Sequence, residues 1–219
     1  MVTYEMIRSS RDIQEYIRRA DESLISLGYT EHSFAHVGKV ADTVEYILET
    51  MGYSEHDVEI GKIAAYLHDI GNLVNRVDHS QSGGVMAFRI LDRMGMDPSD
   101  IAVIVSAIGN HDEGTGVPVH PIAAALILSD KSDVRRSRVR NRDVSTFDIH
   151  DRVNYSVTDS RLVISEDKTE ICLKLSIETQ YSAVMDYFEI FLNRMIMCRK
   201  AAEKLGMKFS LMINEQILL

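Results

Sequence analysis

Histidine and aspartate residues stand at the ends of apolar segments in the first two-thirds of the chain. His68 and Asp69 are adjacent and follow the apolar run that contains Ala64 and Leu67. Burying an imidazole and a carboxylate together is unfavourable unless each finds a partner, and a metal cation satisfies both at once. Residues of the same types are spaced along the chain as further candidate ligands: His36, His79, His111 and Asp130. Their order predicts a metal centre that folding assembles from separate segments.

This arrangement resembles the signature of the HD superfamily of metal-dependent phosphohydrolases. The resemblance is carried by His36 with Val40, by the run His68-Asp69-Ile70-Gly71, and by Asp130. The additional His79 and His111 make the chain similar to the branch of the superfamily that holds two metals. That branch includes the HD-GYP cyclic dinucleotide phosphodiesterases and the di-iron dinucleoside polyphosphate hydrolases.

The chain departs from the HD-GYP pattern at several positions. Asn72 stands where those enzymes carry a lysine, and Asn110 precedes His111 where they carry two adjacent histidines. The Gly-Tyr-Pro element is replaced by Gly116-Val117-Pro118. These differences argue against cyclic di-GMP as the substrate and against a third metal.

The ligand set is explained most simply by two metal ions. His36, His68, Asp69 and Asp130 would hold the first ion, and His79 and His111 the second, with Asp69 bridging through its two oxygens. Imidazole and carboxylate ligands without a thiolate suit iron, manganese, zinc or cobalt. The resemblance favours iron or manganese, with nickel and magnesium as further alternatives. Two cations about 3.5–4 Å apart lower the pKa of a bridging water and clamp phosphoryl oxygens, so the bridging hydroxide is expected to attack phosphorus.

Acidic residues beside the ligands are candidates for further catalytic roles. Asp112 and Glu113 follow His111 and are suited either to orient it or to act as a general acid towards the leaving oxygen. Asp133 lies one turn beyond Asp130 and is expected to reach the same pocket. The alternatives are exposed loop charge for the first two residues and a solvated helix face for Asp133.

One concentrated basic run occurs in a chain whose formal net charge is −9. The run contains Lys131, Arg135, Arg136, Arg138, Arg140 and Arg142. We expect Lys131 and Arg135, with Arg76 from another segment, to bind substrate phosphate through charge-assisted hydrogen bonds. The alternative is that the arginines pair with nearby aspartates or with a neighbouring subunit. The negative net charge disfavours non-specific binding to nucleic acid or to an anionic membrane.

Other histidines compete for a place in the centre. His32 lies four residues before His36, but the position of Val40 favours His36 as the ligand. His56 and His150 are interpreted as solvated side chains, and His120, beside Pro121, as structural.

The spacing of apolar residues places the candidate ligands near helix ends. His36 is expected in the first turn of a helix that Gly52 ends, and a helix that begins after Ser54 delivers His68 and Asp69. Further helices are predicted at about residues 11–27, 80–94, 101–108 and 122–134. The buried face of the helix at 80–94 is expected to contain Val85, Met86, Phe88, Ile90 and Leu91. Ligands on separate rigid helices hold their geometry well, which suits a metal pocket in a helical bundle.

The helical pattern changes to short β-branched runs after Arg142. Strands are predicted at residues 153–157, 162–164, 171–175 and 209–213, with a turn at 158–160 and a helix at 181–205. We therefore expect a mainly α protein, with an HD-type helical metal-binding bundle at residues 1–145. A small α+β subdomain of β-β-α-β order is expected at residues 146–219.

The remaining composition indicates a cytoplasmic protein. Cys172 and Cys198 form no disulfide framework and are interpreted as thiols in a reducing compartment. Residues 1–10 lack a signal-peptide core, and no apolar run approaches the roughly 18 residues of a spanning helix. The expected partner is a small phosphorylated substrate, such as a nucleotide, and homo-oligomerisation is left open.

The leading hypothesis is a metal-dependent phosphohydrolase that hydrolyses a phosphoester or phosphoanhydride of a nucleotide or a related small molecule. One alternative is a non-catalytic nucleotide-sensing HD module, although a site freed from catalysis has no need of every ligand. The other alternative is an HD-type di-iron oxygenase.

Overall fold

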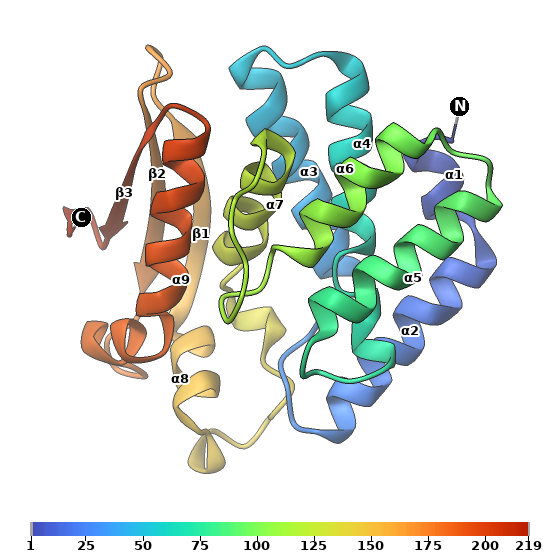
Figure 1. Ribbon diagram of the computed structural model, residues 1–219. Helices are drawn as coiled ribbons and strands as arrows, with labels where there is room; N and C mark the ends of the chain where they lie inside the picture. Colours follow the sequence, from blue (N-terminus) through green and yellow to red (C-terminus); the bar gives the residue numbers. More distant parts are fainter. Residues whose placement is uncertain (1, 219) are drawn as a thin grey trace.

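A bundle of α-helices forms the first two-thirds of the chain in the computed structural model, which describes residues 2–218 (Figure 1). The helices of this part are α1 (Tyr4–Ser9), α2 (Arg11–Ser26), α3 (Phe34–Met51), α4 (Glu55–Leu67), α5 (His79–Arg93), α6 (Pro98–Gly109) and α7 (Pro121–Ser132). A short 3-10 helix, η1 (Ile70–Leu73), follows α4. The mainly α fold class is thereby confirmed.

Local sequence signals define where these helices begin and end. Ser54 and Asp57 form a capping box at the start of α4, which satisfies backbone N–H groups that have no partner within the helix. Asp97 accepts a hydrogen bond from the backbone of Ser99 at the start of α6, where Pro98 is the first helical residue. Gly52 ends α3 with a φ of 83°, a left-handed conformation that glycine adopts without strain.

Helix α7 is the centre of the bundle. Side chains at residues 122–128 are at most 5% exposed. The helix packs against α3, α4 and α6 on one side and against α9 (Val184–Lys204) on the other. Because every face is covered, its sequence is apolar all round rather than striped. Its last turn carries Asp130 and Lys131 into the interior.

Helix α5 packs through small residues instead of the large ones expected. Val85 and Phe88, which the spacing places in the core, are 71% and 52% exposed. The buried face contains Gly83, Gly84 and Ala87. These small side chains let α5 approach η1 and α6 closely, and this approach brings the start of α5 to the centre of the bundle.

The C-terminal part is a small sheet with two helices. Helix α8 (Ile149–Ser156) leads into β1 (Val157–Ile164) and β2 (Glu170–Ile177), α9 follows, and β3 (Lys208–Ile213) and β4 (Gln216–Ile217) complete the sheet. Among residues 2–218 the strand order is β1-β2-β3-β4, with β2 and β3 parallel and the outer pairs antiparallel. The predicted β-β-α-β order is confirmed.

The prediction was wrong for residues 153–156 and 158–160. Residues 153–156 are the end of α8, because Asp148 caps that helix by accepting a hydrogen bond from the backbone of Asp151. Residues 158–160 belong to β1 rather than to a turn. This strand lies at the edge of the sheet, where its polar side chains reach solvent.

Figure 1 shows the sheet and α9 on one side of the bundle, next to α7. Buried apolar residues of both parts pack into one continuous core, so the division at residues 145 and 146 stays a prediction. None of the helices within residues 2–218 combines the length and the apolar character needed to cross a membrane.

Candidate metal centre

The ends of five helices converge on one buried point. His36 lies in the first turn of α3, His68 and Asp69 follow α4, and His79 is the first residue of α5. His111 follows α6, and Asp130 lies in the last turn of α7. The side chains of this set are almost fully buried, and Asp130 is the most exposed at 13%.

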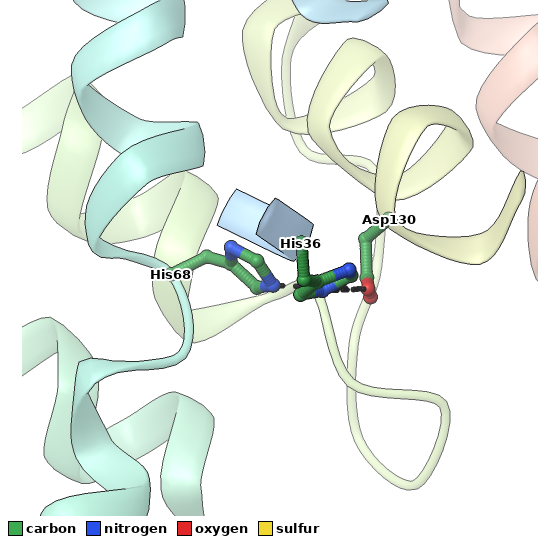
Figure 2. A group of neighbouring side chains, drawn as sticks. All are labelled: His36, His68 and Asp130. Carbon is green, nitrogen blue, oxygen red and sulfur yellow. Dashed lines mark ion pairs between the residues drawn. The ribbon is translucent and has the colours of Figure 1, made fainter. Parts of the chain in front are cut away.

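One group of ligand atoms lies between α3, α4 and α7 (Figure 2). Nε2 of His36 is 3.3 Å from Oδ1 of Asp130 and 3.6 Å from Oδ2 of Asp69. Nε2 of His68 is 3.4 Å from the same Asp69 oxygen and 3.7 Å from the same Asp130 oxygen. Ligand atoms that share one cation at about 2.1 Å lie roughly 3–3.5 Å apart, so the spacing suits a single ion.

A second group shares Asp69 with the first. Oδ1 of Asp69 is 3.5 Å from Nε2 of His79 and 3.9 Å from Nε2 of His111. The two imidazole nitrogens are 3.1 Å apart. Asp69 therefore presents one oxygen to each group, which is the arrangement of a bridging carboxylate.

Hydrogen bonds orient each imidazole with Nε2 towards the interior. Nδ1 of His68, His79 and His111 donates to the backbone carbonyls of Ala65, Arg76 and Ile108, at 2.7, 3.0 and 2.6 Å. Nδ1 of His36 donates to the carboxylate of Asp133 at 2.8 Å. Because these oxygens only accept, Nδ1 carries the proton, and in the neutral ring the lone pair lies on Nε2. This is the tautomer that a metal ligand requires.

Buried nitrogen atoms without hydrogen-bond partners indicate whether the two groups of ligands suit a cation. Nε2 of His36 and Nε2 of His68 are buried without a hydrogen-bond partner among residues 2–218. Nε2 of His79 and Nε2 of His111 direct lone pairs at each other, a repulsive arrangement unless positive charge lies between them. Two nitrogen pairs and a shared carboxylate are ligands suited to first-row divalent cations, so the residues fit such ions.

The carboxylates create a strong demand for positive charge. Burial alone would raise the pKa of Asp69 and Asp130, but His68 beside Asp69 and Lys131 beside Asp130 hold both pKa values well below the usual range. Burial would lower the pKa of His68, but Asp69 and Asp130 outweigh it and raise this pKa to about 10. Either a proton or a cation satisfies this demand, so metal binding competes with protons.

Asp133, Arg135 and Lys131 lie behind the ligands. Asp133 supports His36 and also pairs with Lys39 and Arg135, at 3.2 and 2.9 Å. Arg135 bonds Glu31 at 2.9 Å as well, so its charge is already compensated. Lys131 is buried and contacts Asp130 at 2.5 Å and Glu113 at 3.3 Å. These positions support roles in holding ligands rather than in touching substrate.

Arg76 lies at the edge of the second group. Its Nη1 is 3.3 Å from Asn72 Oδ1, 3.4 Å from His79 Nε2 and 3.9 Å from Asp69 Oδ1. The Asn72 amide donates to Asp69 Oδ1 at 3.0 Å, a positioning role that the sequence pattern did not reveal. Asp112 is half-buried and accepts from the backbone of Gly114, so its catalytic role stays a prediction.

The other histidines lie outside the two groups. His56 pairs with Asp100 at the surface. Nδ1 of His120 accepts from the backbone of Ala123 at the start of α7, in agreement with a structural role. The His32 ring packs against His36 at a centroid distance of 5.6 Å, and His32 and His150 both line a cavity beside the centre.

This cavity is lined by residues of the bundle and of α8 and α9, and it has a volume of about 430 Å³. Its wall includes Arg76, Glu113, Arg138 and Arg194. Arg194, on α9, was missed at the sequence level. The sequence does contain a clue to this residue. Arg194 lies three positions after the buried Phe191 and directly before the buried Met195, so the apolar spacing assigns a charged residue to the core face of the helix.

The fold and the buried ligand set are those of a helical metal-binding protein, and the family comparison agrees with that class. Residues 33–189 match the family described as the HD domain, so the chain belongs to the HD domain family. HD domains bind divalent metals, and the histidine and aspartate groups described above are able to hold one.

Among solved structures, a predicted HD superfamily hydrolase from an uncultured Thermotogales bacterium is similar to the chain. The two are 25% identical, with a TM-score of 0.45, over 62% of this chain and 75% of the other. Comparison with curated protein sequences gives no match.

Proposed function

We propose that the protein is a two-metal phosphohydrolase that acts on a phosphoester or phosphoanhydride of a nucleotide or a related small molecule. The observation that carries the proposal is the division of Asp69 between two groups of inward-facing imidazoles. Divalent cations bound there, with iron or manganese preferred, would lower the pKa of a coordinated water and neutralise charge on phosphoryl oxygens.

The residues of the chain have separate tasks in this proposal. His36, His68, Asp69 and Asp130 would hold one cation, and His79 and His111 would hold the second together with Asp69. Asp133 and the backbone carbonyls fix the tautomers of the imidazoles, so the ligands need little rearrangement on binding. Arg76, whose Nη1 lies 3.9 Å from Asp69 Oδ1, would donate to a phosphoryl oxygen, and this contact with the centre supports that role.

Two substitutions and a substrate screen test the proposal. Metal content is measured on the purified protein, and phosphate release is screened over nucleotides, dinucleotides and phosphomonoesters. Asp69→Ala is expected to lose both metals and all turnover while circular dichroism shows an intact helical fold. His79→Ala is expected to lose mainly the second metal.

Full metal content and turnover in Asp69→Ala would refute the proposal. Bound metal with no hydrolysis of any phosphorylated compound would favour a nucleotide sensor instead. Oxygen uptake with a polyol would reveal a di-iron oxygenase.

A further inference from the structure

The cavity beside the centre carries an inference about the substrate, which rests on the proposed function. Two of its wall residues are linked to the candidate ligands, one directly and one through Lys131. Arg76 contacts His79 and Asp69, and Glu113 bonds Lys131, which in turn contacts Asp130. Figure 1 places the α2–α3 connection, the η1–α5 segment and α8 at the same end of the molecule. Residues of all three segments line the cavity. A molecule in the cavity therefore lies next to the metal ligands.

Arg194 directs unused hydrogen-bond donors into this space. Its Nε donates to Glu113 at 2.9 Å, and its guanidinium lies 4.2 Å from the centre of the Phe191 ring. Neither Nη atom has an acceptor within the described part of the chain, and the side chain is 21% exposed. The planar guanidinium is thus held at one edge and on one face, with its outer N–H groups free for a phosphate.

Arg76 offers a second set of donors from another wall. Its Nη1 is used by Asn72 and His79, whereas Nε and Nη2 find no acceptor among residues 2–218. Arg138 is less available, because it donates to the backbone carbonyls of Glu31 and Asp133. Arg76 and Arg194 are therefore the two arginines that are placed to bind a phosphoryl group together.

The outer rim of the cavity carries negative charge, opposite to that of the arginines in its wall. Asp148 and His150 of the rim are exposed, and Asp151 is half-buried. Asn193, also exposed, adds an amide that donates and accepts hydrogen bonds. A chain of phosphates extending outward from the centre would meet the two carboxylates, whereas an uncharged group with hydroxyls would find donors and acceptors there.

We propose that the cavity selects small phosphate monoesters over polyphosphates, with the phosphoryl group between Arg194 and Arg76 and an uncharged, hydroxyl-bearing remainder against α8. The volume of about 430 Å³ lies near the lower end of the range for ligand pockets, roughly 300–1,000 Å³. A nucleoside monophosphate and a sugar phosphate share this chemistry, and the experiment separates them.

The substrate panel for the manganese-loaded protein contains a nucleoside 5′-monophosphate, a hexose phosphate, a nucleoside triphosphate and a dinucleoside tetraphosphate. We expect kcat/KM for at least one monoester to exceed that for both polyphosphates about tenfold or more. Equal or faster hydrolysis of a polyphosphate overturns the inference but leaves the phosphohydrolase intact. Absence of phosphate release from every compound overturns the proposed function itself.

Arg194 is tested by binding as well as by turnover. Arg194→Gln is expected to weaken binding of inorganic phosphate, measured by calorimetry, about tenfold or more, and to raise KM for the monoester more than it lowers kcat. Arg194→Lys keeps the charge near Glu113 but loses the planar set of donors, and it should lose most of the same affinity. Unchanged phosphate affinity in both variants overturns the inference, whether or not a substrate has been found.

Arg199→Gln is the matched control, because Arg199 lies on the same helix, is exposed and lines a different part of the surface. The rim is tested by Asp148→Asn combined with Asp151→Asn, since asparagine caps α8 as well as aspartate does. This double variant should lower KM for the triphosphate severalfold, and by more than it changes KM for the monoester. An unchanged ratio of the two KM values would contradict the role of the rim.

Discussion

At the scale of single residues, Asp133 shows how the centre depends on side chains that touch no substrate. Its carboxylate accepts from Nδ1 of His36 and is surrounded by Lys39, Arg135 and Arg138. These cations and the hydrogen bond from His36 outweigh burial and hold the pKa of Asp133 far below its usual range. A permanent negative charge behind His36 increases the basicity of the ligand.

Asp133→Asn removes this charge with little change in shape. We expect the affinity for the first metal to fall about 10- to 100-fold, the usual effect of losing such a partner. Titration with manganese, followed by calorimetry, measures it. Asp167→Asn, a substitution of the same kind in the exposed turn between β1 and β2, should leave the affinity unchanged. Equal affinities in the two variants would contradict the supporting role of Asp133.

Glu113 should make stability depend on pH in the acid range. Burial would raise its pKa, but Lys131 and Arg194 lower it from 4.5 to about 2. A depressed pKa contributes stability above the unfolded value of 4.5, and this contribution is lost as the pH falls towards 2. The contribution is on the order of 3 kcal/mol at neutral pH.

Glu113→Gln is therefore expected to lower the free energy of unfolding at pH 6 by up to that amount. The difference from the natural protein should shrink steadily below pH 4.5, where the glutamate begins to be protonated. Denaturant unfolding in the presence of a chelator measures it without interference from metal binding. A difference that stays constant down to pH 3 would contradict the assigned pairing.

The ligand types were readable from the sequence, but their supporting contacts were not. Histidine and aspartate at the ends of apolar helices can be recognised as candidate metal ligands in the sequence, because burying them needs a cation. By contrast, the sequence does not tell whether the hydrogen-bond donors of an arginine are already paired with acceptors of the protein. Arg135 is saturated by Glu31 and Asp133, whereas Arg194, 59 positions along the chain, lines the cavity. Only the three-dimensional arrangement separates the two.

At the scale of elements, the close approach of α5 to η1 positions the second group of ligands. A Cβ atom on Gly71 would lie 2.0 Å from the carbonyl oxygen of His79 and 2.4 Å from the amide nitrogen of Gly83. Both neighbours are backbone atoms, which cannot move away as a flexible side chain can. Gly71 is thus required for His79 to reach Asp69.

Gly71→Ala should therefore destabilise the fold by about 1–3 kcal/mol and reduce occupancy of the second metal. Metal content of the purified variant and thermal unfolding measure the two effects. Gly38→Ala is the control: Gly38 lies within α3 with open space around its Cβ position, and alanine there should stabilise the helix by up to about 1 kcal/mol. Normal metal content in Gly71→Ala would contradict the packing argument.

The start of α6 was predicted well from its end signals, whereas the cap of α8 was overlooked and the core face of α5 is determined by packing. The cap and proline before α6 mark its start in the sequence itself. The β-branched Val153 and Val157 suggested a strand, but the cap at Asp148 starts a helix that continues to Ser156. The core face of α5 was also misassigned, because closeness to η1 selects glycine and alanine over larger apolar residues.

At the scale of the whole molecule, the cavity joins the bundle and the C-terminal part. Arg76 and Arg138 come from the bundle and its following segment, and Asp151 and Arg194 come from α8 and α9. The chain as a whole carries a net charge of −9, yet the inner wall of the cavity is rich in arginine. Local rather than global charge therefore attracts an anionic substrate, and the C-terminal part contributes to that attraction.

Metal removal should loosen the whole bundle, because the ligands come from α3, α4, α5, α6 and α7 or from residues next to them. A ligand present at about 100 times its dissociation constant stabilises the folded state by about 2.7 kcal/mol. For a chain of this size each kcal/mol shifts the melting temperature by about 2–4 °C, so a chelator should lower it by about 5–10 °C. Asp69→Ala should show no such shift. Thermal unfolding with different divalent cations would then rank the cations by how strongly they stabilise the fold. Equal melting temperatures of the natural protein with and without chelator would contradict metal binding at the centre.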